Sequence, residues 1–193
     1  MLTGGEKLDA YLQKIADNLQ TINGNPSVTV GFLEGAFYPD GTSIAMVAAV
    51  QEFGATIQRE PSTVTIYRAI DKSGNFLRNG KFVKRRDSNF ASDHHVGSYE
   101  ITIPPRPFFR NAIKANGPTW GDEMAKRLKA TDYNAEKTLG QMGELIKGQI
   151  QQSIHDLDVP PNAASTIAKK GASKPLIDTG EMWRAVDYRV EAA

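Results

Sequence analysis

The chain has 193 residues, of which 40% are hydrophobic and 23% charged, a composition typical of a soluble globular protein. It contains no cysteine, which excludes disulfide frameworks, thiolate zinc sites and cysteine nucleophiles. Its formal net charge of +1 excludes the strongly basic balance of many nucleic-acid-binding proteins.

Two parts of the sequence indicate whether the chain is exported or inserted into a membrane. Residues 1–6 lack the basic start and apolar core of an export signal. The longest apolar run, 44–50, is far shorter than the roughly 20 residues that a helix needs to span a bilayer. We therefore expect a soluble protein without a membrane partner, folded in a reducing compartment.

The amino-terminal third predicts a helix, a strand and a second helix. Apolar residues at three- and four-residue steps predict an amphipathic helix over 5–22. Those residues are Leu8, Tyr11, Leu12, Ile15, Leu19 and Ile22. The sequence NGNP at 23–26 should end this helix. Alternation over 27–33 predicts a strand, and YPDG at 38–41 a turn. Ser43 is placed to cap a short helix that runs through Phe53 to Gly54.

The middle of the chain, 57–103, predicts β-hairpins. Residues 64–70 alternate as a strand, and DKSG at 71–74 predicts a turn. A second arm over 76–83 includes Asn79-Gly80, the strongest short hairpin signal. A third strand over 96–103 must end at Pro104-Pro105, because proline cannot donate to a β-ladder.

The carboxyl-terminal half is predominantly helical. A helix begins after Pro107, and NGP at 116–118 should interrupt it. The clearest helix spans 135–157 and ends before Pro160-Pro161. A short helix near 162–170, a loop over 171–174, a helical turn over 178–185 and a strand over 186–190 follow in that order. These elements predict one α+β domain over 1–193, with a small antiparallel β-sheet packed by amphipathic helices and no internal repeat.

The sequence LIDTG at 176–180 resembles the signature of aspartic proteases, in which paired carboxylates activate water. Such enzymes need a second aspartate and a β-barrel-like setting, whereas the residues after Gly180 predict a helix and a strand. The favoured interpretation is structural: Asp178 caps the next helix and Glu181 reaches back as a capping box, worth about 1 kcal/mol. A hydrolase built on Asp178 is the alternative, and it predicts that Asp178→Asn abolishes peptide cleavage.

The other residues that could support catalysis are scattered. His94 and His95 are adjacent, so on a strand they would face opposite sides, and His155 is remote from both in sequence. The chain has no Gly-x-Ser-x-Gly elbow and no phosphate-binding loop. We therefore expect no enzyme activity, no cofactor and no metal site.

A basic cluster lies in the predicted hairpin region, because residues 59–90 sum to +5 while residues 1–58 sum to −4. The cluster consists of Arg78, Lys81, Lys84, Arg85 and Arg86. It could face the phosphates of DNA, or it could be a solvated edge strand that its charges protect from aggregation. In a ring assembly the same arm could reach a neighbouring subunit. A nucleic-acid-binding module over 68–86 is accordingly the alternative function.

The segment 101–110 combines prolines, phenylalanines and arginines. Prolines fix an extended backbone, and aromatic residues and arginine are enriched in interface hot spots. The candidate subunit interface is Arg106, Pro107, Phe108, Phe109 and Arg110. The alternative is a rigid strand-to-helix connection whose phenylalanines join the core.

Three segments carry a resemblance to a known family. They are VAAVQEFG at 47–54, IPPRPFFR at 103–110, and PLIDTGEM at 175–182 followed by YRV at 188–190. Together they resemble the tail-completion (neck, or virion-morphogenesis) proteins of long-tailed bacteriophages, over roughly 28–60 and 101–190. Residues 61–100 depart from the family pattern and are interpreted as an inserted β-hairpin arm.

The resemblance implies a structural virion protein that is assembled in the host cytoplasm and located in the neck. Such a subunit would form a homo-oligomeric ring, expected as a hexamer, that completes the tail top and leaves a channel for DNA. Its implied partners are the stopper or connector, the tail terminator or tube, and passing viral DNA. A closed ring needs two different complementary patches on each subunit. The segment 106–110 and the basic hairpin are the candidates.

Overall fold

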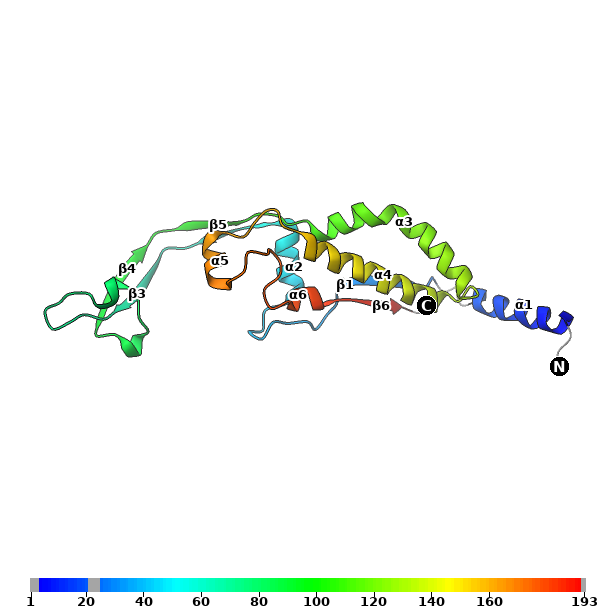
Figure 1. The fold of residues 1–193 in the computed structure, drawn as a ribbon, viewed down its shortest axis with the longest axis horizontal. Helices are drawn as coiled ribbons and strands as arrows, with labels where there is room; N and C mark the ends of the chain where they lie inside the picture. Colours follow the sequence, from blue (N-terminus) through cyan, green and yellow to red (C-terminus); the bar gives the residue numbers. More distant parts are fainter. Residues whose placement is uncertain (1–3, 21–24, 192–193) are drawn as a thin grey trace. The chain divides into compact units, whose positions relative to one another are not determined.

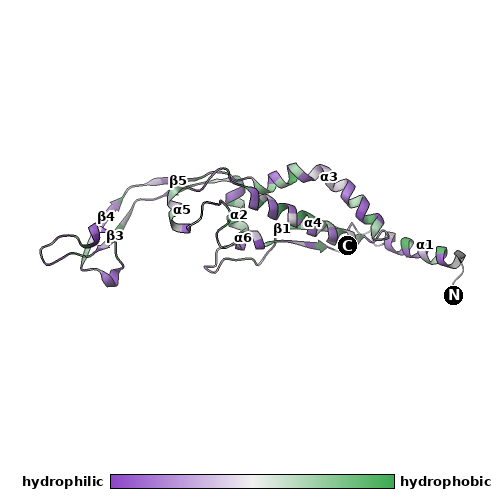
Figure 2. Ribbon diagram, in the orientation of Figure 1, coloured by the Kyte–Doolittle hydropathy of each residue, from purple (hydrophilic) through white to green (hydrophobic). Residues whose placement is uncertain are grey.

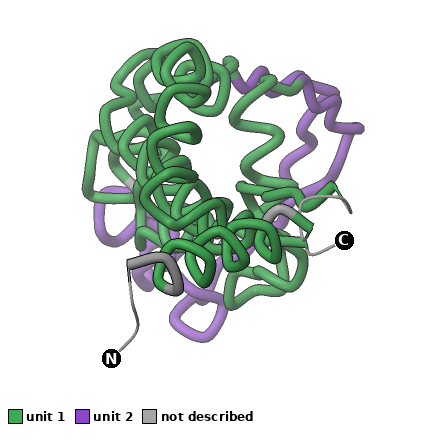
Figure 3. Tube along the Cα trace, turned by 90° about the vertical axis from the view of Figure 1, so that its right-hand side faces the viewer, with its two compact units in different colours: residues 1–55, 104–193 green, residues 56–103 purple. Residues whose placement is uncertain are grey.

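The computed structural model describes residues 4–20 and 25–191 (Figure 1). The chain divides into two compact units (Figure 3). Unit 1 comprises Met1–Ala55 and Pro104–Ala193, and unit 2 comprises Thr56–Ile103. Helices and small antiparallel sheets of two strands each make up the structure, which confirms the predicted α+β class. Unit 2 overlaps the segment 61–100 that the sequence marks as an insertion.

The sheet of unit 1 joins elements from near the two ends of the chain. Strand β1 (Ser27–Phe32) pairs antiparallel with β6 (Val186–Glu191), so that Phe32 lies opposite Val186. Helix α4 (Ala135–Asp156) contacts both strands, and Figure 1 shows the three elements running side by side. The strands predicted over 27–33 and 186–190 are therefore confirmed.

Helix α4 supplies much of the core. Asn134 caps it by accepting a hydrogen bond from the Lys137 N–H at 2.8 Å. The apolar stripe that predicted this helix is buried between the sheet and neighbouring helices. Its fully or nearly fully buried members include Met142, Ile150 and Ile154. Periodicity alone located this helix correctly.

Helix α3 (Phe108–Ala130) packs against α4 and contains Pro118, so the predicted interruption at 116–118 is wrong. Pro118 removes one backbone donor, but side chains hold the surrounding turns together. The Asn116 amide donates to the Ala112 carbonyl at 2.9 Å, and the Trp120 indole N–H donates to Gln149 of α4 at 2.8 Å. Figure 1 shows α3 bowed along its length, as expected for a helix that accommodates proline.

Helix α2 (Ile44–Phe53) is capped as predicted. The Ser43 hydroxyl accepts a hydrogen bond from the Met46 N–H at 3.4 Å. Gly54 has a φ of 76° and donates its N–H to the Val50 carbonyl. The turn over 38–41 is also confirmed, because the Gly41 N–H donates to the Tyr38 carbonyl at 2.9 Å.

Helix α1 (Gly4–Gln20) confirms the amphipathic helix over its described residues, and Figure 2 shows apolar and polar residues alternating along it. Lys14 forms an ion pair with Asp132 at 2.7 Å. Leu8, Tyr11 and Leu12 of the apolar stripe are exposed. The predicted end of the helix at 23–26 lies partly outside the described residues. Among the described helices, none is long and apolar enough to cross a membrane.

Two short helices lie near the carboxyl end, α5 (Ala164–Lys170) and α6 (Glu181–Arg184). Gly180 occupies the N-cap of α6 with a left-handed φ of 79°, and none of the described side chains caps this helix. The predicted capping box of Asp178 and Glu181 is therefore wrong. The reason is that the glycine conformation turns the backbone directly into the helix.

Unit 2 consists of two antiparallel strand pairs. Strand β2 (Ala55–Arg59) pairs with β5 (Tyr99–Ile103), and β3 (Ser62–Arg68) pairs with β4 (Phe90–Val96). The sequence did not predict β2 or β4 as separate strands. Side-chain hydrogen bonds connect β3 and β4. The Thr65 hydroxyl donates to Asp93 Oδ1 at 2.7 Å, and Thr63 Oγ1 lies 2.7 Å from His95 Nδ1.

The predicted hairpin at Asn79-Gly80 is wrong. These residues belong to a short 3-10 helix, η2 (Leu77–Gly80), in which Arg78, Asn79 and Gly80 all have positive φ. A second 3-10 turn, η3 (Arg85–Asp87), follows. Strand β3 pairs with β4 across the whole loop 69–89, so the local turn signal does not decide the strand pairing. The turn at 71–74 is confirmed, because the Gly74 N–H donates to the Asp71 carbonyl at 3.1 Å.

The buried Gly143 provides a test of the packing between α4 and β6. A Cβ at this position would lie 2.6 Å from Cγ and 2.9 Å from Cε2 of the Tyr188 ring. We expect Gly143→Ala to lower the free energy of unfolding by about 1–3 kcal/mol, because the ring must shift. The matched control on the same helix is Gly148→Ala, where a Cβ meets no atom within 4 Å, and it should stabilise by about 0.5–1 kcal/mol. Urea denaturation followed by circular dichroism measures both, and equal effects would contradict this account of the packing.

Candidate interaction surfaces

The segments 47–54 and 103–110 contact each other in unit 1. We call their contact the Glu52–Arg106 cluster, and it consists of Gln51, Glu52, Phe53, Arg106 and Arg110. Glu52 is only 4% exposed. Its carboxylate accepts hydrogen bonds from the backbone N–H groups of Phe109 at 2.9 Å and Arg110 at 3.2 Å, and from Arg110 Nε at 2.8 Å.

Glu52 supplies the hydrogen-bond acceptor that the N-terminus of α3 lacks in its own sequence. The N-cap residue of α3 is Pro107, which has no side-chain acceptor for the free N–H groups of the first turn. The Glu52 carboxylate, which comes from the end of α2, accepts two of these N–H groups instead. Its negative charge is also favourable beside the positive end of the helix dipole. Glu52 therefore acts as an N-cap supplied from another helix.

Arg106 connects a third segment to the cluster. Its guanidinium donates to the carbonyls of Pro160 at 3.1 Å and Pro161 at 3.2 Å, and to Asn162 Oδ1 at 3.3 Å. It also donates to the Gln51 side chain. Arg106 is 6% exposed, and this burial lowers its pKa. Arg106 thus links the residues that follow α4 to Gln51 near the end of α2.

These contacts correct the predicted subunit interface. Phe108 is fully buried, and Arg106 is nearly so, because both serve the interior of their own chain. Phe109 is partly buried, with its ring centroid 5.6 Å from that of Phe108. The alternative interpretation of 101–110, a rigid connection whose phenylalanines join the core, describes these three residues. Pro107, which precedes α3, is half-buried.

The exposed part of the cluster lies at Arg110 and Phe53. The Arg110 guanidinium sits 5.3 Å from the centroid of the Phe53 ring, a cation–π arrangement. Phe53 is 70% exposed, and the Arg110 side chain 57%. These two side chains remain available to a partner.

An apolar hollow of about 410 Å³ lies between α2 and α3, beside Arg110. Its lining includes Phe32, Ala45, Ala49, Phe53, Phe109 and Ile113. Ala45 and Ile113 lie outside the segments 47–54 and 103–110 that the sequence pattern marked, whereas Ala49 lies inside the first of them. The signal was present, since Ala45, Ala49 and Phe53 follow one another at four-residue steps along α2 and so share a face.

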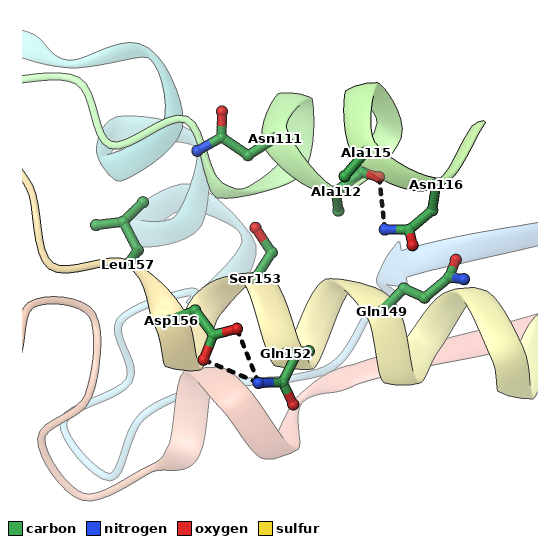
Figure 4. A pocket seen from close by; sticks show the side chains of 9 residues that line it. All are labelled: Asn111, Ala112, Ala115, Asn116, Gln149, Gln152, Ser153, Asp156 and Leu157. Carbon is green, nitrogen blue, oxygen red and sulfur yellow. Dashed lines mark hydrogen bonds between the residues drawn. The ribbon is translucent and has the colours of Figure 1, made fainter. Parts of the chain in front are cut away.

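A second hollow, of about 390 Å³, lies between α3 and α4 (Figure 4). Most of its polar side chains have hydrogen-bond partners within the chain: the Gln152 amide donates to both Asp156 oxygens at 2.8 Å, and the Ser153 hydroxyl donates to the Phe108 carbonyl at 2.7 Å. Hydrogen bonding, first from Gln152 and then from His155, lowers the pKa of Asp156. The Ser153 hydroxyl therefore has a backbone carbonyl as its partner in place of a general base.

The basic residues of the predicted hairpin lie in the loop 69–89, which we call the basic tip. Arg78 lies in η2, Arg85 and Arg86 lie in η3, and Lys81 and Lys84 lie between the two turns. All five are exposed. The structure therefore brings them into one loop, though on short turns instead of a hairpin arm.

Asp178 is exposed, and its charge acts on the half-buried Tyr38. Burial, followed by the charges of Glu181 and Asp178, raises the pKa of Tyr38.

Within the described residues, no group of three His, Asp or Glu side chains is arranged to hold a metal ion. Comparison with known proteins gives no further assignment, because no family model, curated protein or solved structure matches the chain.

Proposed function

We propose that the chain is a structural subunit of the neck of a long-tailed bacteriophage, without catalytic activity. In this proposal it forms a homo-oligomeric ring, a hexamer, that completes the tail top and joins it to the head connector around a channel for DNA. The proposal starts from the resemblance of 47–54, 103–110 and 175–190 to tail-completion proteins.

The Glu52–Arg106 cluster is the observation that carries the proposal. Two of the three resembling segments bond directly, through residues that are more than fifty positions apart in sequence: Gln51 and Glu52 in the first segment, and Arg106, Phe109 and Arg110 in the second. A shared pattern at these positions therefore has one physical reason, which is the capping of α3 and its attachment to α2. This supports a resemblance that reflects a common subunit fold.

Exposed apolar side chains provide independent support for assembly. On α1 they are Leu8, Tyr11 and Leu12. On the strands of unit 2 they are Ile57, Val64, Val96, Tyr99 and Ile101. Two-stranded ribbons are marginally stable alone, so a neighbour that covers these side chains would stabilise unit 2. A closed ring needs two different complementary patches on each subunit, and the apolar side chains of α1 and of unit 2 are our candidates for them.

Two measurements test the proposal. Native mass spectrometry of the purified chain should give a closed species with six copies of the 21.1 kDa subunit. Electron cryo-microscopy of virions that contain the chain should place it at the junction of head and tail. A chain that stays monomeric at all concentrations, together with a junction that lacks it, would overturn the proposal.

The exposed stripe of α1 gives a specific prediction. We expect the double variant Leu8→Gln and Leu12→Gln to lose the ring while the subunit keeps its circular dichroism spectrum, because both side chains are already exposed. The control places substitutions away from the apolar stripe of the same helix, as Ala10→Gln and Asp17→Gln, and should leave the ring intact. Size-exclusion chromatography with light scattering measures the mass of each. A ring that persists in the stripe variant would remove α1 from the interface.

A further inference from the structure

The basic tip is held in shape by its own hydrogen bonds. The Val83 N–H donates to the Tyr67 carbonyl at 3.0 Å, and the Leu77 N–H donates to the Ala69 carbonyl at 2.8 Å. The Asn89 side chain bonds both the N–H and the carbonyl of Ile70, at 2.7 and 2.8 Å. The cations of this loop are therefore presented on a defined backbone.

A small aromatic cluster lies at the base of the basic tip. The Arg68 guanidinium lies 5.1 Å from the ring centroids of both Phe76 and Phe82. The rings of Phe76 and Phe90 meet edge to face at 5.7 Å. Both Phe76 and Phe82 thus already interact with a cation of their own chain.

The remaining charges of the basic tip are strongly unbalanced. Residues 69–89 carry six lysine and arginine residues against two aspartates. The Asp71 carboxylate accepts hydrogen bonds from its own turn, with Ser73 N–H at 2.8 Å and Asn75 N–H at 2.9 Å. Asp87 contacts Arg86 only at 3.7 Å. All six cations are exposed, so the tip presents a concentrated positive charge to solvent.

We infer that the basic tip binds the phosphate backbone of duplex DNA. Arginine and lysine neutralise phosphates, and the planar guanidinium group can bond two phosphate oxygens at once. Binding of single strands relies on free aromatic faces for base stacking. Phe76 and Phe82 already pair with Arg68, which favours contacts to the backbone over contacts to bases. Phe76 is 48% and Phe82 67% exposed, so insertion into an anionic lipid surface is the competing outcome that the test must distinguish.

The predicted binding is non-specific in sequence and strongly dependent on salt. The test is fluorescence anisotropy of a labelled duplex of about 20 base pairs with the full chain between about 50 and 200 mM salt. The logarithm of the affinity should fall linearly with the logarithm of the salt concentration, with a slope of about −0.9 for each phosphate contacted. The triple variant Lys84→Gln, Arg85→Gln and Arg86→Gln should bind at least about tenfold more weakly and reduce the slope by about 2–3.

The matched control removes the same charge from α3, as Lys114→Gln, Lys126→Gln and Lys129→Gln, all of which are exposed. This control should bind DNA nearly as the wild type does. Equal losses in the two triple variants would show attraction by overall charge and would overturn the inference. So would the absence of DNA binding, or binding to phosphatidylserine vesicles without binding to the duplex. The inference does not require a ring, so DNA binding by a chain that never oligomerises would refute only the proposed function.

Discussion

Replacing Glu52 by alanine is expected to lower the free energy of unfolding by about 2–4 kcal/mol. The substitution leaves the N–H groups of Phe109 and Arg110 without their acceptor at a helix end whose proline cap cannot replace it. The lost ion pair adds little, because the Arg110 side chain is largely hydrated. The capping of α3 therefore dominates the expected effect.

Urea denaturation followed by far-ultraviolet circular dichroism measures the effect of Glu52→Ala. Glu52→Gln keeps an acceptor oxygen and should lose less stability than Glu52→Ala. The matched control is Glu34→Ala, an exposed position where the change should stay within about 0.5 kcal/mol. If Glu52→Ala unfolds at the same urea concentration as the wild type, Glu52 does not cap α3.

Replacing Phe108 by alanine should cost about 3–5 kcal/mol, because its side chain is fully buried and the cavity can collapse only partly. The ring meets Phe32 edge to face at a centroid distance of 6.1 Å, so the substitution also removes a contact between α3 and β1. Thermal unfolding monitored by circular dichroism should show a large fall in Tm. An unchanged Tm would contradict the burial of Phe108.

The control for Phe108→Ala is Phe53→Ala, which removes an equally large but mostly exposed ring and should change stability little. The comparison also separates folding from assembly. A Phe108 variant that fails to assemble would do so because its subunit is destabilised. A Phe53 variant that folds but fails to assemble would place the exposed end of α2 in an interface.

The segment 103–110 was only partly predictable from the sequence. The composition of 103–110 correctly marked a segment with an unusual structural role. It predicted a surface between subunits, whereas Arg106 and Phe108 serve the interior of one subunit. Prolines, phenylalanines and arginines suit both environments equally well. Only the position of Glu52 and of the carbonyls at Pro160 and Pro161 distinguishes them.

Elements whose signals are local could be predicted correctly from the sequence. The helical period over 135–157, the alternation over 27–33 and the Ser43 cap each depend on residues a few positions apart, and each is confirmed. Three other features depend on contacts between distant residues: the passage of α3 through Pro118, the pairing of β3 with β4 across the Asn79-Gly80 turn signal, and the capping of α3 by Glu52. In each case, packing or hydrogen bonds between residues distant in sequence outweigh a local preference worth about 1–3 kcal/mol.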